Sequence, residues 1–547
     1  MNNETIHLSI SGMTCDGCAR TVSKQFDDKE GVLNKNVSYP EEQAEITYNP
    51  KKISRDEIID TINATGHYKV TGEISDGDIG RDRYSLVIIG GGSAAFAAAI
   101  RASELGGSVL ILNKGLPTGG TCVNVGCIPS KTLIRTAEAH HRAAHPGFEG
   151  IETQSRIADF KKIIEQERSL VADLRKQKYI DVISDDTNIT LLKERGKLID
   201  KHTVEAGGKK YSSDNILIAT GASTYIPDVP GLEEADFLTN ETIYKLKDLP
   251  RKLLIFGGGY IALENAQLFA RLGSEVTLIQ RSEHVLSEQP EELAREITNY
   301  LQDDGIKILT NTKLQRVFTA GDETIVKIKK DGEETMLKAT HLLVAAGRQG
   351  NTKDLQLDAA GLTSVDRGYV PVNKTMCTAV NNIFAAGDVT GKHQFVYTAA
   401  YEGKLAADNA LRSESRNADY SVLPWVIFTD PQIAGIGLDE RQARQEGLNY
   451  DTAKLSLDNV PRSIVARDTR GFIKLIRNRD NDQIIGSRIL APEGSELLME
   501  LALAMRHGVT VETLTEEFHP YLTLSEGIKL AALAFDKNVN KLSCCAV

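Results

Sequence analysis

The sequence predicts a multidomain α/β protein, and three observations support this fold class. Two stretches, beginning at residues 84 and 252, combine an apolar strand, a glycine-rich turn and a helical run. That order is typical of a parallel sheet covered by helices. Short strand and helix patterns over residues 1–72 predict a separate βαββαβ module. The region after residue 419 mixes strands with helices and predicts an α+β domain.

Length and charge set limits on the protein. A chain of 547 residues is too long for one hydrophobic core. The net charge of −11 argues against a nucleic-acid partner, which would require a basic surface. No run approaches the ~20 apolar residues of a membrane helix, so we expect no membrane partner. The N-terminus lacks the features of a signal peptide. We therefore expect a cytoplasmic protein whose seven cysteines are reactive or metal-binding thiols.

The first module has six expected elements. Its strands and helices are predicted, in chain order, at Thr5–Ile10, Cys18–Asp28, Val32–Ser38, Gln43–Tyr48, Ser54–Ala64 and around Tyr68–Val70. This order is the ferredoxin-like split pattern. A loop between the first strand and helix contains Cys15 and Cys18 as C-x-x-C, and two such thiolates can bind one soft cation. The alternative is a thioredoxin-like redox pair, but the element order does not fit it. The stretch GMTCDGC resembles the metal-binding loop of heavy-metal-associated domains.

The remaining boundaries follow from composition and pattern. Residues 73–83 are acidic and lack periodicity, which predicts a flexible linker. We expect a first nucleotide-binding domain at residues 84–230 that is completed by residues 346–419. A second nucleotide-binding domain is expected at 231–345, and the α+β domain at 420–547.

The glycine-rich turn after the strand at residues 84–89 matches a dinucleotide fingerprint. Gly90 would form the turn, Gly92 would allow close approach of a pyrophosphate, and Ala95 occupies the third small position. The next strand ends at Asn113, where an acidic residue usually binds the ribose hydroxyls. Asparagine can still accept a hydrogen bond, so the site is retained with its ribose contact altered.

A second fingerprint follows the strand at residues 252–256. Gly257, Gly259 and Ala262 occupy the three small positions. The following strand is succeeded by Gln280 and Arg281 instead of an acid. A guanidinium can pair with a 2′-phosphate, so NADPH is favoured over NADH, although Arg281 could also be merely solvated.

Between the two fingerprints lies the stretch GGTCVNVGCIPSK, residues 119–131, with two cysteines five positions apart. Cys122 and Cys127 precede a helical run, and a thiol at a helix start is biased toward thiolate. A structural disulfide or half of a zinc site are the alternatives. Zinc normally takes four ligands, and no second pair at finger spacing follows. We therefore predict a redox-active dithiol.

This stretch resembles the redox-active signature of the flavoprotein disulfide reductases, the family of glutathione reductase and lipoamide dehydrogenase. The resemblance implies FAD at the first fingerprint, a nicotinamide cofactor at the second, and a homodimer whose subunits complete each other's active sites. Cys127 would face the flavin, Cys122 would exchange with substrate, and Glu264 would pair with Lys131 near the flavin ring. The other flavin contacts that it implies are Thr121, Thr220, Gly221 and Asp388.

In that family the last domain ends with His-Pro-Thr-x-Ser-Glu, whose histidine moves a proton. Here the segment reads HPYLTLSE, and Tyr521 stands at the histidine position. A phenol with a pKa near 10 is a poor proton shuttle at neutral pH. A gapped alignment would instead restore His519 to that role, so both readings stay open.

The chain ends with two adjacent cysteines, Cys544 and Cys545. Their Cα atoms are ~3.8 Å apart, below the ~4.4 Å lower limit of relaxed disulfides, so bridging them would be strained. A terminal dithiol is better suited to holding a soft metal and passing it on, and randomly exposed cysteines are the alternative.

Taken together, these features resemble the Hg(II)-reducing branch of the family. The resemblance implies that Tyr260 and Tyr521 lie near the metal and that the tail cysteines deliver Hg(II), as a thiolate complex, to Cys122 and Cys127. We predict NADPH- and FAD-dependent reduction of Hg(II) to Hg(0). The alternatives are an NADPH disulfide reductase with an appended copper-type module and a metal-carrier protein.

Overall fold

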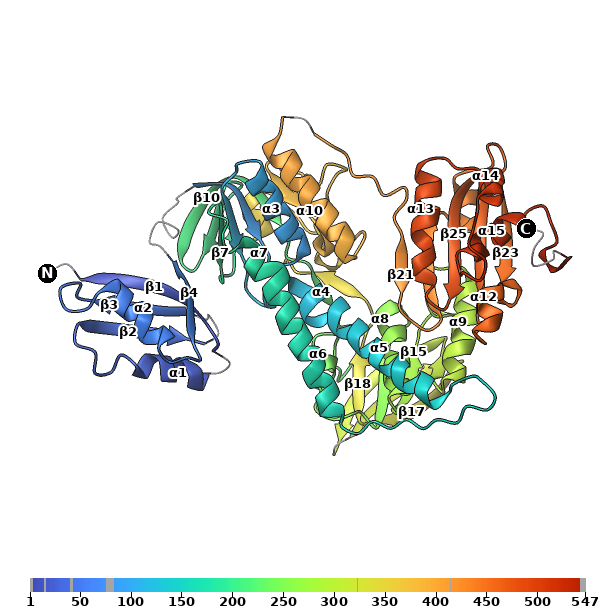
Figure 1. Ribbon diagram of the computed structural model, residues 1–547, viewed down its shortest axis with the longest axis horizontal. Helices are drawn as coiled ribbons and strands as arrows, with labels where there is room; N and C mark the ends of the chain where they lie inside the picture. Colours follow the sequence, from blue (N-terminus) through green and yellow to red (C-terminus); the bar gives the residue numbers. More distant parts are fainter. Residues whose placement is uncertain are drawn as a thin grey trace.

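The computed structural model describes residues 3–13, 16–39, 43–74, 83–321, 323–413 and 415–541. Figure 1 shows the N-terminal module, two central sheets crossed by long helices, and a C-terminal domain built on a sheet of its own. In the part of the chain that is described, no helix has the length and apolar character needed to cross a membrane.

The N-terminal module has the predicted βαββαβ order. Its elements are β1 (Glu4–Ser11), α1 (Asp16–Lys24), β2 (Val32–Ser38), β3 (Gln43–Tyr48), α2 (Arg55–Asn63) and β4 (Lys69–Ile74). The strands form an antiparallel sheet in the order β2-β3-β1-β4. Leu8 and Ile46 of this sheet are fully buried, as is Ile58 of α2. Ser54 and Glu57 form a capping box that fixes the start of α2.

Two predictions about this module need correction. Helix α1 ends at Lys24, and the residues up to Asp28 are turns instead of helix. The sheet extends past the predicted boundary at residue 72, because β4 continues to Ile74. The next strand begins at Arg83, so the linker expected at 73–83 is shorter at both ends.

The first nucleotide-binding domain surrounds a seven-stranded sheet. Its order is β7-β6-β5-β10-β9-β8, with β20 also paired to β10. The strands are β5 (Arg83–Ile89), β6 (Val109–Leu112), β7 (Ile189–Leu192), β8 (Lys197–Leu198), β9 (Thr203–Ala206), β10 (Lys209–Ile218) and β20 (Ile383–Ala385). The helices are α3 (Ser93–Glu104), α4 (Gly120–Val125), α5 (Cys127–Ala144), α6 (Phe160–Arg175), a π-helical turn (Lys176–Ile180), α7 (Asp181–Ile183) and α10 (Val396–Leu411). Strands β5, β6 and β7 run parallel, as the fingerprint requires.

The second nucleotide-binding domain has a parallel sheet in the order β14-β13-β12-β18 and a three-stranded antiparallel sheet. Its strands are β12 (Lys252–Phe256), β13 (Glu275–Ile279), β14 (Lys307–Leu309), β15 (Thr312–Ala320), β16 (Glu323–Lys330), β17 (Glu333–Ala339) and β18 (His341–Val344), with helices α8 (Tyr260–Arg271) and α9 (Glu291–Asp303). Strands β11 (Ala222–Thr224) and β19 (Arg348–Gly350) pair where the chain enters and leaves this domain.

The C-terminal domain is the predicted α+β unit. Its antiparallel sheet has the order β21-β22-β25-β24-β23. The strands are β21 (Trp425–Ile427), β22 (Gln432–Gly437), β23 (Tyr450–Ser456), β24 (Phe472–Asn478) and β25 (Gln483–Ala491), and the helices are α11 (Glu440–Gln445), α12 (Pro461–Val465), α13 (Leu498–Arg506), α14 (Val511–Glu516) and α15 (Glu526–Leu533). Strand β22 was not predicted, because glycines interrupt its apolar pattern. Gly435 is required there, since a Cβ would lie 2.4 Å from the Trp425 ring.

Helices α3 and α10 pack closely, which brings both against the first phosphate-binding loop. Gly403 of α10 makes this possible, because a Cβ at that position would lie 2.1 Å from the carbonyl oxygen of Ala94. The alanines of α3 supply a smooth partner surface, and Ala95, Ala98 and Ala99 are fully buried.

We predict that Gly403→Ala destabilises the protein by about 1–3 kcal/mol, since the added methyl group overpacks a backbone contact. Thermal unfolding of the flavin-loaded protein would measure this loss. Lys404→Ala, at the exposed neighbouring position, is the control and is expected to change stability by less than about 0.5 kcal/mol. Equal unfolding midpoints for the two variants would contradict the importance of this contact.

Candidate active site

The dithiol segment lies directly on the first phosphate-binding loop. The N–H of Gly119 donates to the carbonyl oxygen of Gly91 at 2.7 Å. Gly120 sits against Gly92, and a Cβ at Gly120 would lie 2.7 Å from the Gly92 Cα. Gly120 also has a positive φ of 62°. Glycine is therefore needed where α4 begins, two residues before Cys122, and this start of the helix lies against the dinucleotide loop.

Cys122 lies in α4, and Cys127 is the first residue of α5. Both are free, half-buried thiols. The pKa of the Cys127 thiol is lowered to about 7, first by the hydrogen bond with the Cys122 thiol and then by the Lys131 ammonium, although burial opposes the shift. The pKa of Cys122 is raised by the same hydrogen bond and by burial. Cys127 is thus the thiolate of the pair near neutral pH.

Lys131 follows Cys127 by one helical turn and forms an ion pair. Its Nζ lies 2.7 Å from Oε2 of Glu264 on α8, as expected for these two residues. The Glu264 side chain is only 5% exposed. Its second oxygen accepts the backbone N–H of Phe428 at 2.9 Å, so the carboxylate is satisfied on both sides.

The residues around the first loop fit a dinucleotide. Helix α3 starts at Gly92 without any side-chain cap, which leaves backbone N–H donors for a pyrophosphate. Gly221, in the turn between β10 and β11, borders open space, since a Cβ there would meet nothing within 4 Å. The hydroxyl of Thr220 is buried and has no protein partner, as expected of a group that bonds a ligand. Thr121 lies half-buried in α4 beside this loop.

The second loop has matching geometry. Gly257 has a φ of 131°, and a Cβ there would lie 2.1 Å from the Ala345 carbonyl oxygen. Helix α8 begins at Gly259 without a side-chain cap, and a Cβ at Gly259 would meet open space. Ala262 is fully buried beneath the loop. Arg281 is exposed, where a cofactor phosphate could reach it.

The residues that replace the two ribose-binding acids lie against the middle glycines of the loops. A Cβ at Gly91 would lie 2.4 Å from the Asn113 side chain, and one at Gly258 would lie 2.9 Å from that of Gln280. Asn113 also donates to the carbonyl oxygen of Leu116 at 3.3 Å. The side chains of Asn113 and Gln280 therefore pack against the two phosphate-binding loops. The sequence pattern did not reveal this role.

Asp388 forms an ion pair with Arg348 at 2.9 Å, and both side chains are mostly buried. Burial raises the pKa of Asp388, and Arg348 opposes that shift. Burial likewise raises the pKa of Tyr260, the first residue of α8, while the nearby Arg348 opposes it. Sequence analysis did not single out Arg348. Its position after β18, where the chain returns from the second nucleotide-binding domain to the first, is the one sequence feature that could have indicated its role.

Sequence analysis also overlooked Tyr179. This residue lies in the π-helical turn after α6, and such turns are frequent at functional sites. Its hydroxyl is 3.1 Å from that of Ser93 at the start of α3, and its ring packs against Phe96. A Cβ at Gly119 would lie 3.1 Å from the same ring. Tyr179 thus packs against the loop that leads into the dithiol.

His519 and Tyr521, the two residues that could occupy the family's histidine position, differ in their surroundings. The Nε2 of His519 lies 2.7 Å from Oε1 of Glu500, and the His519 side chain is 8% exposed. Tyr521 is 53% exposed. The carboxylate of Glu526 accepts the N–H of Leu522 and holds this turn. His519 is therefore engaged within its own chain, while Tyr521 is presented outward.

The described residues include only some of the cysteines that are predicted to bind metal. Cys18 is a half-buried residue of α1, whereas Cys15 lies outside the described residues. Cys544 and Cys545 lie outside them too. No set of three or more His, Cys, Asp or Glu within the described ranges could hold a metal ion.

Comparison with protein families matches nearly the whole chain. Residues 84–403 match the pyridine nucleotide-disulphide oxidoreductase family, and residues 423–532 match its dimerisation domain. Residues 7–67 match the heavy-metal-associated domain. These matches imply a flavin and a pyridine nucleotide as cofactors, and they support a homodimer.

Similar proteins show to which members of this oxidoreductase family the chain is related. The chain is 40% identical over 551 residues to mercuric reductase of Staphylococcus aureus, with 100% of both chains covered. It is 41% identical to mercuric reductase of Lysinibacillus sphaericus, covering 98% of this chain and 99% of the relative. The chain belongs to the mercuric reductases. A third member of this enzyme family, from Streptomyces lividans, is 42% identical over 85% of this chain and 98% of its own.

A solved structure supports the same fold. The HOCl-induced flavoprotein disulfide reductase RclA from Escherichia coli superposes with a TM-score of 0.74 at 29% identity, covering 82% of this chain and 99% of that one. Both chains therefore share the architecture of an oxidoreductase.

We predict that Cys127 titrates near pH 7 in a Cys122→Ser variant, where a hydroxyl still donates to the thiolate. In Cys122→Ala the midpoint should rise by about 1–2 pH units, because the hydrogen bond to the charged sulfur is lost. The measurement is the pH dependence of Cys127 alkylation, read by peptide mass spectrometry. Identical midpoints for the two variants would contradict the donor role of position 122.

Proposed function

We propose that the chain reduces Hg(II) to Hg(0) at Cys122 and Cys127, using FAD and NADPH. The observation that carries this proposal is the half-buried thiol pair, one member of which is a thiolate near neutral pH. Two thiolates bind a soft cation such as Hg(II) linearly, and membership of the mercuric reductases supports this substrate.

The chain's own groups perform the binding steps. Cys122 exchanges with the incoming Hg(II) thiolate complex, and its proton passes to the thiolate that leaves. Cys127, already a thiolate near neutral pH, then displaces the second thiolate. Lys131 offsets the negative charge that gathers at the pair, because its ammonium lies one helical turn from Cys127. We assign Tyr260 to the metal's surroundings, since its helix begins beside the second phosphate-binding loop.

The two cofactors follow from the two loops. We assign FAD to the loop at Gly90, Gly92 and Ala95, with Thr220 and Asp388 as further contacts. NADPH is assigned to the loop at residues 257–259. When bound, the flavin would supply the two electrons that Hg(II) accepts. Glu264 keeps the Lys131 ammonium in place for that transfer.

We extend the proposal to a dimer in which each active site uses residues of both subunits. The matching dimerisation domain and the outward exposure of Tyr521 support it. The Cys544 and Cys545 thiols of one subunit would then pass Hg(II) to the Cys122 and Cys127 pair of the other, and the N-terminal Cys15 and Cys18 pair would capture it. A cytoplasmic location agrees with this use of free thiols.

The other candidate is an NADPH-dependent disulfide reductase. The likeness to RclA, a flavoprotein disulfide reductase, favours it. The burial of the His519 side chain, which is 8% exposed, weighs against it, because dithiol exchange needs an accessible acid-base group near the thiols. The residue that is exposed in this segment is Tyr521, a poor proton shuttle at neutral pH.

We expect the intact protein to oxidise NADPH in an Hg(II)-dependent manner and to release mercury vapour in excess thiol. Cys127→Ala should abolish vapour release, because one of the two sulfur ligands is lost. The double variant Cys544→Ala/Cys545→Ala should lower the rate. Cys377→Ala is the matched control, since this thiol is half-buried with its pKa raised by burial. Faster reduction of a small disulfide than of Hg(II) by the intact protein would overturn the assignment.

We predict that Arg281→Ala raises KM for NADPH about tenfold and leaves KM for NADH unchanged, since one charge-assisted phosphate contact contributes about 1.5 kcal/mol. Steady-state kinetics with both cofactors tests this. Arg295→Ala, on α9 of the same domain, is the control. A parallel change in both KM values would show that Arg281 does not read the 2′-phosphate.

A further inference from the structure

The ion pair between Lys131 and Glu264 has a third participant from the C-terminal domain. The Lys131 Nζ lies 4.8 Å from the ring centroid of Phe428, within the range of a cation–π contact. The backbone N–H of Phe428 donates to the Glu264 oxygen that Lys131 does not use. One residue thus contacts both members of the pair, with its ring on the cation and its N–H on the anion.

Lys131 needs such a restraint. Its side chain is 32% exposed, and a lysine ammonium on its flexible stem can leave a single carboxylate partner for water. The Phe428 ring covers one side of the ammonium while Glu264 binds another. Holding the charge matters here, because Lys131 lies one turn from Cys127 on the same face of α5.

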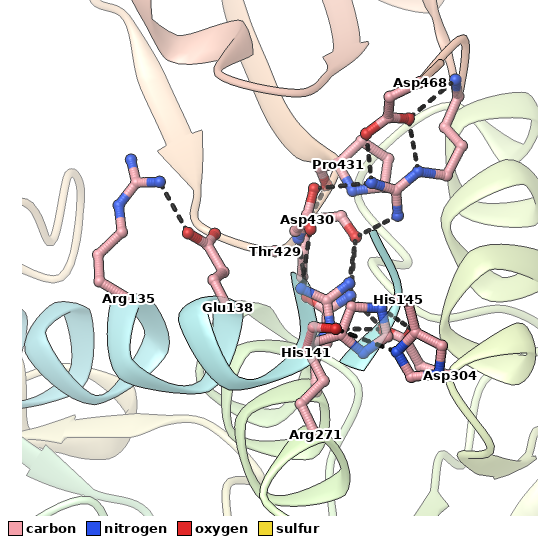
Figure 2. A network of polar contacts seen from close by, with 12 residues as sticks. Arg135, Glu138, His141, His145, Arg271, Asp304, Thr429, Asp430, Pro431 and Asp468 are labelled. Atoms are coloured by element: carbon pink, nitrogen blue, oxygen red, sulfur yellow. Dashed lines mark hydrogen bonds and ion pairs between the residues drawn. The ribbon is translucent and has the colours of Figure 1, made fainter. Parts of the chain in front are cut away.

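Phe428 is itself anchored through the residues that follow it. Gln267 of α8 accepts the N–H of Asp430 at 2.7 Å and donates to its carbonyl oxygen at 2.8 Å. Arg271 donates to Oδ2 of Asp430 at 2.8 Å. Figure 2 shows Asp430 and its neighbours Thr429 and Pro431 beside Arg271 and Asp304. Asp430 cannot shift without breaking buried, charge-assisted bonds.

The anchoring residues form a stripe along α8. Glu264, Gln267 and Arg271 are three and four positions apart, which places them on one face of the helix. They are 5%, 4% and 7% exposed. All three bind residues 428–430, so the C-terminal domain is fixed to the helix that begins at the second phosphate-binding loop. Arg470 of that domain completes the anchor with an ion pair to Asp430 at 3.0 Å.

We propose that Phe428 is a positioning residue that holds the Lys131 ammonium beside the dithiol. It acts through Lys131 and Glu264, the two residues that its ring and its backbone N–H contact. The importance of Lys131 for turnover rests on the proposed Hg(II) reduction, but the position of its ammonium can be measured without any turnover.

The test compares Phe428→Leu with Phe428→Tyr in the full-length, flavin-loaded protein. Leucine removes the aromatic face and keeps the backbone donor, whereas tyrosine keeps both. Brief acetylation with acetic anhydride, followed by peptide mass spectrometry, measures how accessible each lysine ammonium is. We expect the acetylation rate of Lys131 to rise about threefold in Phe428→Leu and to stay at the wild-type value in Phe428→Tyr.

Lys454 is an internal reference. Its Nζ lies 4.4 Å from the Phe472 ring and pairs with Glu292, so it reports a similar contact in a different part of the fold. Its acetylation rate should not change in either variant. If Phe428→Leu does not fold, Phe428→Met, of similar volume and without a ring, takes its place.

Three results would overturn the proposal. They are an unchanged Lys131 rate in the leucine variant, an equal rise in the tyrosine variant, and a parallel rise at Lys454, which would indicate general loosening. Hg(II) turnover of the same samples is read separately. Loss of restraint at Lys131 with unchanged turnover would support the positioning role while contradicting the proposed importance of Lys131 in the reaction.

Discussion

The architecture depends on the buried carboxylate of Glu264, which binds a lysine from one domain and a backbone N–H from another. A carboxylate that is 5% exposed is stable only when hydrogen bonds replace its water. Glu264 belongs to α8, which begins at the second phosphate-binding loop. A single helix thus sets the distance between the nucleotide loop, the dithiol helix and the C-terminal domain. A shift of any of these three parts would leave a buried charge unpaired.

A second constraint is the glycine contact between the dithiol loop and the first phosphate-binding loop. Gly119 is hydrogen-bonded to Gly91, and Gly120 lies against Gly92 so closely that a side chain on Gly120 would not fit. This contact fixes the position of Cys122 relative to the loop. The start of α5 fixes the position of Cys127. The fold therefore fixes the two sulfurs by backbone packing from one side and by Lys131 from the other. Such fixed placement favours charge stabilisation without rearrangement during reaction.

This chain combines the core with cysteines near both of its ends. The N-terminal module has a sheet and a buried core of its own. In the C-terminal segment, His519 is bound to Glu500 while Tyr521 is exposed. The imidazole is thereby covered by its own chain, whereas the phenol is accessible. This arrangement suits ligand exchange on a soft metal better than dithiol chemistry that needs acid-base help.

The sequence by itself determined the element order of the N-terminal module, both glycine loops and the dithiol, because each depends on local spacing that the chain carries whatever surrounds it. Its errors fell at segment ends and at β22, where packing against Trp425 overrides local preference. Only the tertiary structure brought in Arg348, Tyr179 and Phe428. These residues are distant in sequence from the dithiol and belong to no motif. Their importance comes from neighbours that the fold brings together from distant parts of the chain.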